Sequence, residues 1–215
     1  MLKQINNKIA YSKDMKRYIH SLMPLKGGEW DNKEPQMQKL HTVIREQLKI
    51  YQDNECAYCG LHLEETGKSE IEHIAPKGGK KRPHYPQFAF TRYNLALACN
   101  LCNSPIKKGT KDTFDYVDPI NYRQCTFKMV HPYFDNPEDH FEYSPSGKKI
   151  IVQPKTPKGI KSIEIFDLNN EAHCNARAKE ILLKSLPEDT IEDIITNALL
   201  YKPLFNNVLQ RVSNP

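Results

Sequence analysis

A histidine preceded directly by a carboxylate is the first pair of residues in this chain whose types suggest chemistry. Glu72 and His73 end a stretch that is expected to be a strand, and Pro76 then takes the chain out of regular structure. Neighbouring strand residues point to opposite faces, so a twist or bulge here lets the carboxylate hold a metal ion while the imidazole faces water. An imidazole with a pKa of about 6.5 accepts a proton at cellular pH. A lone histidine is more often structural, and the neighbouring motifs are what favour His73 as a general base.

Two C-x-x-C pairs bracket this histidine and supply four thiols, at Cys56, Cys59, Cys99 and Cys102. Four thiolates form a closed tetrahedral site that leaves no position for water, so the pairs predict a structural zinc ion. The alternative is a set of free buried thiols. The two other cysteines, Cys125 and Cys174, are isolated, and this spacing indicates metal binding in a reducing compartment rather than a secreted disulfide framework.

Two asparagines, Asn94 and Asn103, flank the second cysteine pair. An asparagine side chain can fix a loop, orient a catalytic histidine, or offer its carbonyl oxygen to a hard cation. Asn103 is expected to begin or enter a short helix, which places Lys107, four residues later, on the same face. A metal ion and a phosphate-binding lysine would then share one site.

Basic residues are concentrated on the same part of the chain. Between His73 and Lys111 there are eight lysines and arginines and no acidic residue, so the rest of a chain with net charge +5 is acidic overall, at −3. The positive electrostatic potential of this stretch is what a site that binds phosphate groups needs. A solvated basic face is the alternative, and His84 is a rival imidazole within the stretch. The expected phosphate contacts are Lys77, Lys80, Lys81, Arg82, Lys107 and Lys108.

The composition predicts a globular protein, and its expected mixture of helices and strands makes it an α+β protein. Its 215 residues, 39% of them hydrophobic, can bury a core. No apolar run approaches the roughly 20 residues that span a bilayer, and the N-terminus has no signal-peptide apolar region. We therefore expect a cytoplasmic protein with no membrane partner.

Hydrophobic periodicity and turn residues predict the elements that hold these motifs. Helices are expected over 10–23, with Ser12 as N-cap, and over 35–53, followed by short strands, loops and one short helix over 54–111. Further on, 148–153 and 160–168 are expected to be paired strands, and helices are expected over 169–186, 188–201 and 203–212. The predicted organisation is an N-terminal helical segment (1–53), a central module with the motifs (54–115) and a C-terminal α/β extension (116–215).

In order and spacing, the motifs resemble the HNH endonucleases, of the His-Me-finger or ββα-metal class, in their zinc-stabilised form. The resemblance covers about 55 residues and runs from the first cysteine pair through I-E-H-I-A-P-K and N-L-A-L-A-C-N-L-C-N to K-K-G. It implies that His73 is the general base, that Asn94 is the central asparagine, and that Glu72 and Asn103 hold the catalytic metal. Glu72 stands where Asp is commoner and Asn103 where His is frequent. Their oxygen atoms favour Mg²⁺ or Mn²⁺.

A wider resemblance covers most of the chain. The N-terminal helices, the stretch H-P-Y-F-D-N-P-E-D-H-F over 131–141, and the segment I-F-D-L-N over 165–169 before a helix bearing Arg177 are similar to the HNH subunit of Septu and retron-linked bacterial anti-phage systems. That family works with an ATPase subunit of the ABC/SMC type, so the resemblance implies such a partner. An apolar stripe from Ile191 to Leu209 offers helical anchors for a partner, although the same stripe would serve an ordinary core.

The expected function is a metal-dependent endonuclease that hydrolyses phosphodiester bonds, with DNA as the expected substrate and with a catalytic Mg²⁺ or Mn²⁺ beside the structural zinc. One alternative is a non-catalytic, zinc-stabilised nucleic-acid-binding or scaffold protein. Another is a stand-alone modification-dependent restriction endonuclease, which would need a base-reading element that the C-terminal region does not display.

Overall fold

The structure of this chain is a computed structural model, and it describes residues 2–65, 67–144 and 149–187 together with residues 190, 192 and 196. The chain divides into two compact units, Met1–Cys174 and Asn175–Pro215. The two cysteine pairs, the candidate site residues and the basic stretch all lie in the first unit. The three-part organisation at residues 53/54 and 115/116 stays a prediction. Within the described residues, every helix is too short or too polar to cross a membrane.

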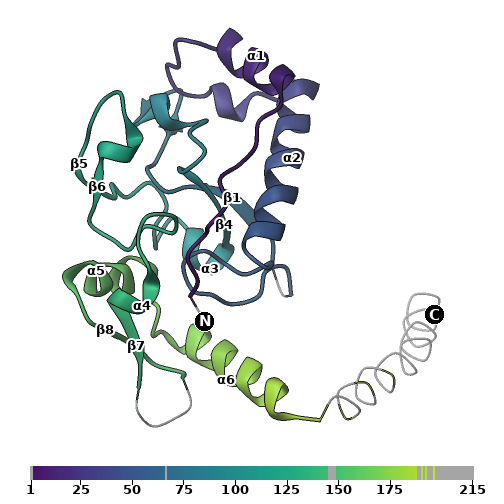
Figure 1. The fold of residues 1–215 in the computed structure, drawn as a ribbon, viewed down its shortest axis with the longest axis vertical. Helices are drawn as coiled ribbons and strands as arrows, with labels where there is room; N and C mark the ends of the chain where they lie inside the picture. Colours follow the sequence, from purple (N-terminus) through teal and green to yellow (C-terminus); the bar gives the residue numbers. More distant parts are fainter. Residues whose placement is uncertain are drawn as a thin grey trace, which may run out of the picture. The chain divides into compact units, whose positions relative to one another are not determined.

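Two N-terminal helices form as the sequence predicts (Figure 1). α1 (Lys13–Ser21) is capped by Ser12, whose side chain accepts a hydrogen bond from the amide of Met15. α2 (Pro35–Tyr51) begins with a proline at its first position, where no amide hydrogen is needed, and buries the stripe Met37, Leu40, Ile44 and Leu48. Between them, the 3₁₀ turn η1 (Glu29–Asp31) buries Trp30.

The centre of the unit is a pair of antiparallel strands, β1 (Ser69–His73) and β4 (Leu95–Cys99), followed at once by the short helix α3 (Asn100–Asn103). Four of the five residues of β4 are buried, so this strand runs through the core, and α2 packs along it. β1 ends at His73, as predicted. α3 ends earlier than expected, because Asn103, which was expected to begin or enter the helix, is its last residue.

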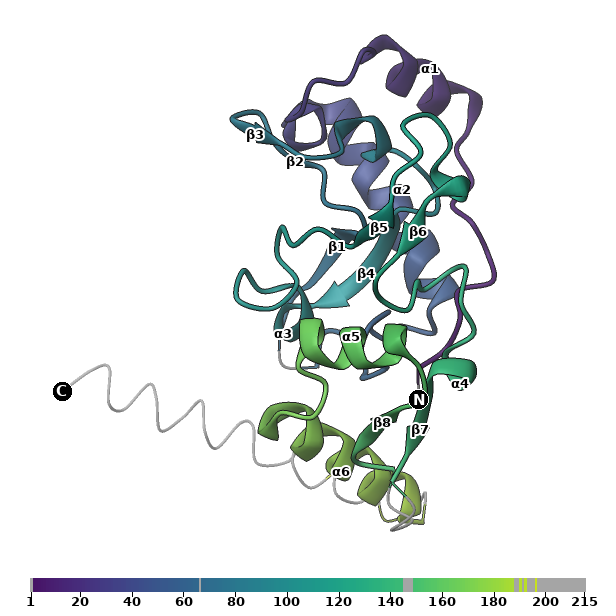
Figure 2. The ribbon, with the colours of Figure 1, turned by 90° about the vertical axis from the view of Figure 1, so that its left-hand side faces the viewer.

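Short elements connect the two strands and continue from them. β2 (Gly78–Gly79) and β3 (Arg82–Pro83) form a small hairpin that projects from the body of the unit (Figure 2). The 3₁₀ turn η2 (Pro86–Phe88) leads back toward β4. Beyond α3, β5 (Phe114–Tyr116) pairs with β6 (Thr126–Phe127) around the 3₁₀ turn η3 (Tyr122–Gln124).

One prediction about the C-terminal half is wrong. α4 (Pro137–His140) precedes β7 (Phe141–Tyr143), and β7, not residues 160–168, pairs with β8 (Val152–Pro154). Residues 160–168 instead fall mostly in α5 (Pro157–Phe166), which buries Gly159, Ser162, Ile165 and Phe166. The N-cap bond from Gly159 to Thr156, with Pro157 at the first helical position, starts a helix here, and burial at helical spacing outweighs the β-branched residues.

α6 (Glu171–Ser185) matches the helix predicted over 169–186. The helices predicted over 188–201 and 203–212, and the partner-binding stripe from Ile191 to Leu209, lie outside the described residues apart from residues 190, 192 and 196.

Candidate active site and metal centre

The candidate site is built on β1, β4 and α3. The register pairs Ser69 with Cys99 and His73 with Leu95, so α3 starts beside the first residues of β1 and His73 lies at the other end. The turns after α3 bring Lys108 back along β1, where its ammonium bonds to the carbonyl of His73. Thr113 also bonds to the carbonyl of Ile74. The end of β1 is therefore fixed by the segment that follows the second cysteine pair.

His73 is held in one defined orientation. Its Nε2 lies 3.0 Å from the carbonyl oxygen of Ala89, and Trp30 packs edge-on at 4.5 Å between ring centroids. A carbonyl can only accept a hydrogen bond, so Nε2 carries the proton and Nδ1 of the neutral ring keeps a lone pair. Burial, followed by the charge of Lys77, lowers the pKa of His73 well below its usual range. The rival imidazole, His84, is exposed and lies outside this buried arrangement.

The carboxylate of Glu72 is buried and ion-paired. Its Oε1 contacts the ammonium of Lys108, and the two side chains are 7% and 1% exposed. Burial raises the pKa of the Glu72 carboxyl, although the neighbouring Lys108 ammonium opposes the shift. Lys108 thus neutralises a buried anion. In the structure the ammonium of this lysine contacts Glu72 and the carbonyl of His73, whereas the sequence analysis predicted that it contacts a substrate phosphate.

Asn94 is fully buried and ties two loops together. Its amide nitrogen donates to the carbonyls of Ala75 and Phe88, and its oxygen accepts from the amide of Ala75, at 2.6 to 3.1 Å. Tyr122 also donates to this oxygen, at 2.9 Å, and lies 3.1 Å from Nε2 of His131. These bonds fix the loop that supplies the carbonyl partner of His73. Asn94 therefore contacts that loop rather than the His73 ring.

Asn103 lies at the other end of β1 and bonds to a carboxylate that the sequence analysis did not select. Its side-chain nitrogen donates to Glu70 at 2.7 Å. Glu70 and Glu72 are two residues apart on a strand and so face the same side. Lys107 follows the end of α3 and does not share a helical face with Asn103, which corrects the expected geometry. Its ammonium instead contacts Asp167.

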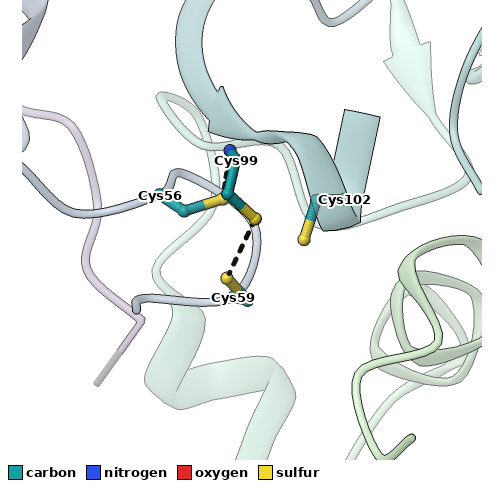
Figure 3. Close-up of side chains that lie close together, drawn as sticks. All are labelled: Cys56, Cys59, Cys99 and Cys102. Carbon is teal, nitrogen blue, oxygen red and sulfur yellow. Dashed lines mark hydrogen bonds between the residues drawn. The ribbon is translucent and has the colours of Figure 1, made fainter. Parts of the chain in front are cut away.

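The cysteines of the two C-x-x-C pairs gather in one place, here called the four-cysteine cluster (Figure 3). Their sulfur atoms all lie within 4.8 Å of one another, and Cys59 Sγ is 3.8 Å from Cys99 Sγ. Zinc–sulfur bonds of about 2.3 Å in a tetrahedron place sulfurs about 3.8 Å apart, so the cluster could bind zinc. All four are free cysteines.

Binding of a metal ion at the cluster would release protons from the thiols. Hydrogen bonds from the other thiols, Cys102 first, lower the pKa of Cys99, whereas contacts with Cys56 and the remaining sulfurs raise the pKa of Cys102. Without a cation the sulfurs cannot all be thiolates, and a bound zinc ion would displace the remaining protons. His173, at the start of α6, places Nε2 3.5 Å from Cys102 Sγ and anchors Nδ1 3.0 Å from the carbonyl of Asp167.

The basic residues of the stretch lie in different surroundings. Lys77 forms an ion pair with Asp31 at 2.8 Å. Lys80, Lys81 and Arg82 belong to the projecting β2–β3 hairpin, here called the basic hairpin (Figure 2), and Lys80 and Lys81 are exposed there. The structure therefore brings Glu72, His73 and Lys108 together and leaves the basic hairpin free to contact a ligand.

Four residues of the site were missed by sequence reasoning: Glu70, Tyr122, His131 and His173. The i, i+2 spacing of Glu70 and Glu72 on a predicted strand was a signal for a shared face. The partners of Tyr122, His131 and His173 are set by tertiary packing, and no local spacing indicates them.

Comparison with known proteins gives one informative similarity. No family model matches the chain. The chain is 28% identical, over 153 residues, to "Septu protein PtuB" of Bacillus mycoides (strain KBAB4). The match covers 63% of this chain and 50% of the relative, so the chain spans about half the length of that protein.

Proposed function

We propose that this protein is a metal-dependent HNH endonuclease that hydrolyses phosphodiester bonds, with DNA as its substrate, and that it is the nuclease component of a Septu-like anti-phage defence system. The similarity to Septu protein PtuB supports the defence role. The observation that carries the nuclease assignment is the His73 ring. Its Nε2 is fixed by the Ala89 carbonyl, so Nδ1 is the basic atom, at the end of the strand that also carries Glu72.

In this proposal His73 acts as general base. The depressed pKa keeps the ring neutral at cellular pH, so Nδ1 can take a proton from water, and the Nε2 bond stabilises the imidazolium that results. Asn94 acts as a positioning residue, since its bonds to the Ala75 and Phe88 backbone hold the loop that carries Ala89. The expected ends are a 5′ phosphate and a 3′ hydroxyl.

Glu72 and Asn103 are the residues proposed to hold the catalytic metal, with Glu70 beside them. A carboxylate and an amide oxygen suit a hard cation such as Mg²⁺ or Mn²⁺. Such an ion, when bound, polarises the scissile phosphate and stabilises the departing oxygen. The zinc expected in the four-cysteine cluster has four sulfur ligands and no open position, so its proposed role is to hold β4 and α3 in place.

Cleavage of supercoiled plasmid tests the activity. Wild-type protein with Mg²⁺ or Mn²⁺ is expected to nick or linearise the plasmid, and His73→Ala is expected to lose on the order of 10²- to 10⁴-fold in rate. His84→Ala is the matched control, because this imidazole is exposed and should leave the rate unchanged. Equal rates for His73→Ala and wild type would refute the mechanism.

We also propose an ABC/SMC-type ATPase as partner and the cytoplasm as location, both on the strength of the family resemblance. Co-expression with an ATPase of this type, followed by size-exclusion chromatography, is expected to give one complex. A protein that elutes alone and cleaves fully without the ATPase would instead support the stand-alone restriction endonuclease.

One observation favours the non-catalytic alternative, a zinc-stabilised binding or scaffold protein. Lys108 already neutralises Glu72, as a metal ion would. Titration of Mn²⁺ followed by electron paramagnetic resonance distinguishes the two: bound Mn²⁺ that is lost in Glu72→Gln supports the nuclease, and no bound Mn²⁺ supports the scaffold.

A further inference from the structure

A second feature of the first unit, outside the site described above, is an open groove of about 420 Å³ between α1 and the loop that enters β4. Its volume is in the range of pockets that take small organic ligands. Its lining includes three aromatic and three basic side chains: Tyr11, Phe90, Tyr93, Lys16, His20 and Arg92. None of the described residues that line the groove is acidic.

The aromatic side of the groove is firmly held. Tyr11 donates its hydroxyl hydrogen to the carbonyl of Phe90 at 3.0 Å, which fastens the segment before α1 to the loop. The guanidinium of Arg92 lies over the Tyr11 ring, 5.3 Å from its centroid. A second arginine, Arg123, lies 5.7 Å from the centroid of the Tyr93 ring. Each of these two tyrosine rings at the groove therefore has an arginine guanidinium over it.

The basic side of the groove comes from α1. Lys16 and His20 are four residues apart, on one face of the helix, and both are exposed. Arg92 and Tyr93 across from them are partly exposed, so part of each side chain is within reach of a ligand, although the Tyr93 ring also packs near Tyr133 and Phe134. The groove thus offers flat surfaces for a ring and cations for an anion.

The groove is connected to His73 by direct contacts. Phe90 follows Ala89, whose carbonyl accepts the bond from His73, and the ring of Trp30 packs against both Phe90, at 5.4 Å, and His73, at 4.5 Å. The groove and His73 therefore share the loop of Ala89 and Phe90 and the ring of Trp30.

We propose that this groove binds an unpaired nucleotide of single-stranded nucleic acid, with its base stacked on the Arg92 and Tyr93 side and its phosphate near Lys16 and His20. Bases in a duplex are already stacked and hide their faces, whereas an unpaired base can stack on aromatic rings or guanidinium planes. The proposal rests on the proposed function in that it names part of the substrate of the same protein.

Fluorescence anisotropy with labelled oligo(dT) tests the proposal, on the His73→Ala protein and without added divalent metal, so that cleavage cannot consume the probe. Tyr93→Ala and Arg92→Ala are expected to weaken oligo(dT) binding roughly 5- to 150-fold, the range for loss of one stacked base. Lys16→Ala should weaken it less and reduce its salt dependence. Tyr116→Ala and Lys39→Ala are matched controls, because both side chains are exposed away from the groove.

Two further arms of the experiment identify the ligand. A blunt duplex of the same length should be insensitive to Tyr93→Ala, and equal losses on duplex and oligo(dT) would overturn the assignment to an unpaired base. Unchanged oligo(dT) binding in correctly folded Tyr93→Ala and Arg92→Ala proteins would overturn the groove itself. Plasmid cleavage by the wild-type protein is measured separately. Loss of the groove assignment would therefore not affect the nuclease proposal. Conversely, oligo(dT) binding that depends on Tyr93 and Arg92 would support the groove even if no plasmid were cleaved.

Discussion

Replacing Lys108 by methionine tests the central contact of the site, its buried ion pair with Glu72. Both side chains are almost fully buried, at 1% and 7% exposure, so the substitution leaves an anion in the interior without its cation. It also removes the ammonium that bonds to the carbonyl of His73. Breaking a buried pair from one side typically costs about 3–5 kcal/mol. For a chain of this size, each kcal/mol shifts Tm by about 2–4 °C, so a fall of roughly 6–20 °C is expected.

Thermal unfolding followed by circular dichroism measures this effect. Lys107→Met is the matched control, since the adjacent lysine pairs with Asp167, whose side chain is 52% exposed, and such pairs contribute about 0–1 kcal/mol. The double variant Lys108→Met with Glu72→Gln should recover much of the loss, because neither charge is then left alone. A Lys108→Met protein as stable as Lys107→Met would refute the reasoning.

Three further predictions concern the metal centre, the basic hairpin and pH. Metal analysis of purified protein should find about one zinc per chain, and the Cys56→Ser protein should lose zinc and unfold. Cys125 is buried outside the four-cysteine cluster, so the control Cys125→Ser should keep zinc. A folded, zinc-free wild-type protein would contradict this assignment. Neutralising Lys80, Lys81 and Arg82 together should weaken DNA binding for all sequences and flatten its log–log salt dependence by up to about 0.9 per lost phosphate contact; an unchanged slope would place the DNA elsewhere. Burial lowers the pKa of His131, and the Lys158 charge adds to the shift, so the unfolded state binds a proton below about pH 6.5 that the native state resists. The free energy of unfolding should therefore fall as pH drops below about 6.5, by up to about 1.4 kcal/mol per pH unit for this group, and His131→Gln should lose less in urea titrations than wild type; equal pH slopes would exclude His131 as a source.

Local signals in the sequence were enough for several elements. The cap at Ser12, the proline at the start of α2 and its apolar stripe predict the two N-terminal helices, because these signals act within one or two turns. Likewise, the two C-x-x-C pairs predict the four-cysteine cluster, because each pair already points two sulfurs to one place.

The same local signals failed over residues 160–168. Ile160, Ile163 and Ile165 are β-branched, and Ile163 and Ile165 flank the polar Glu164, which favours a strand, yet the segment through Phe166 is helical in α5. Phe166 stacks on Tyr58 at 4.0 Å, and the hydrogen that replaces a side chain on Gly159 lets the helix approach the carbonyl of His140. Packing against distant residues therefore decided the element, which intrinsic β preference could not.

The sequence by itself determined which residue types could do chemistry: a carboxylate beside a histidine, four thiols in two pairs, and a run of cations without anions. Only the tertiary structure decided their partners. Glu72 meets Lys108, His73 meets the carbonyl of Ala89, and Cys102 meets His173, each across a long stretch of chain. The physical reason is that such contacts follow from strand register and burial. A buried polar group must find a partner wherever the fold brings one, and the spacing of residues along the chain does not record where that is.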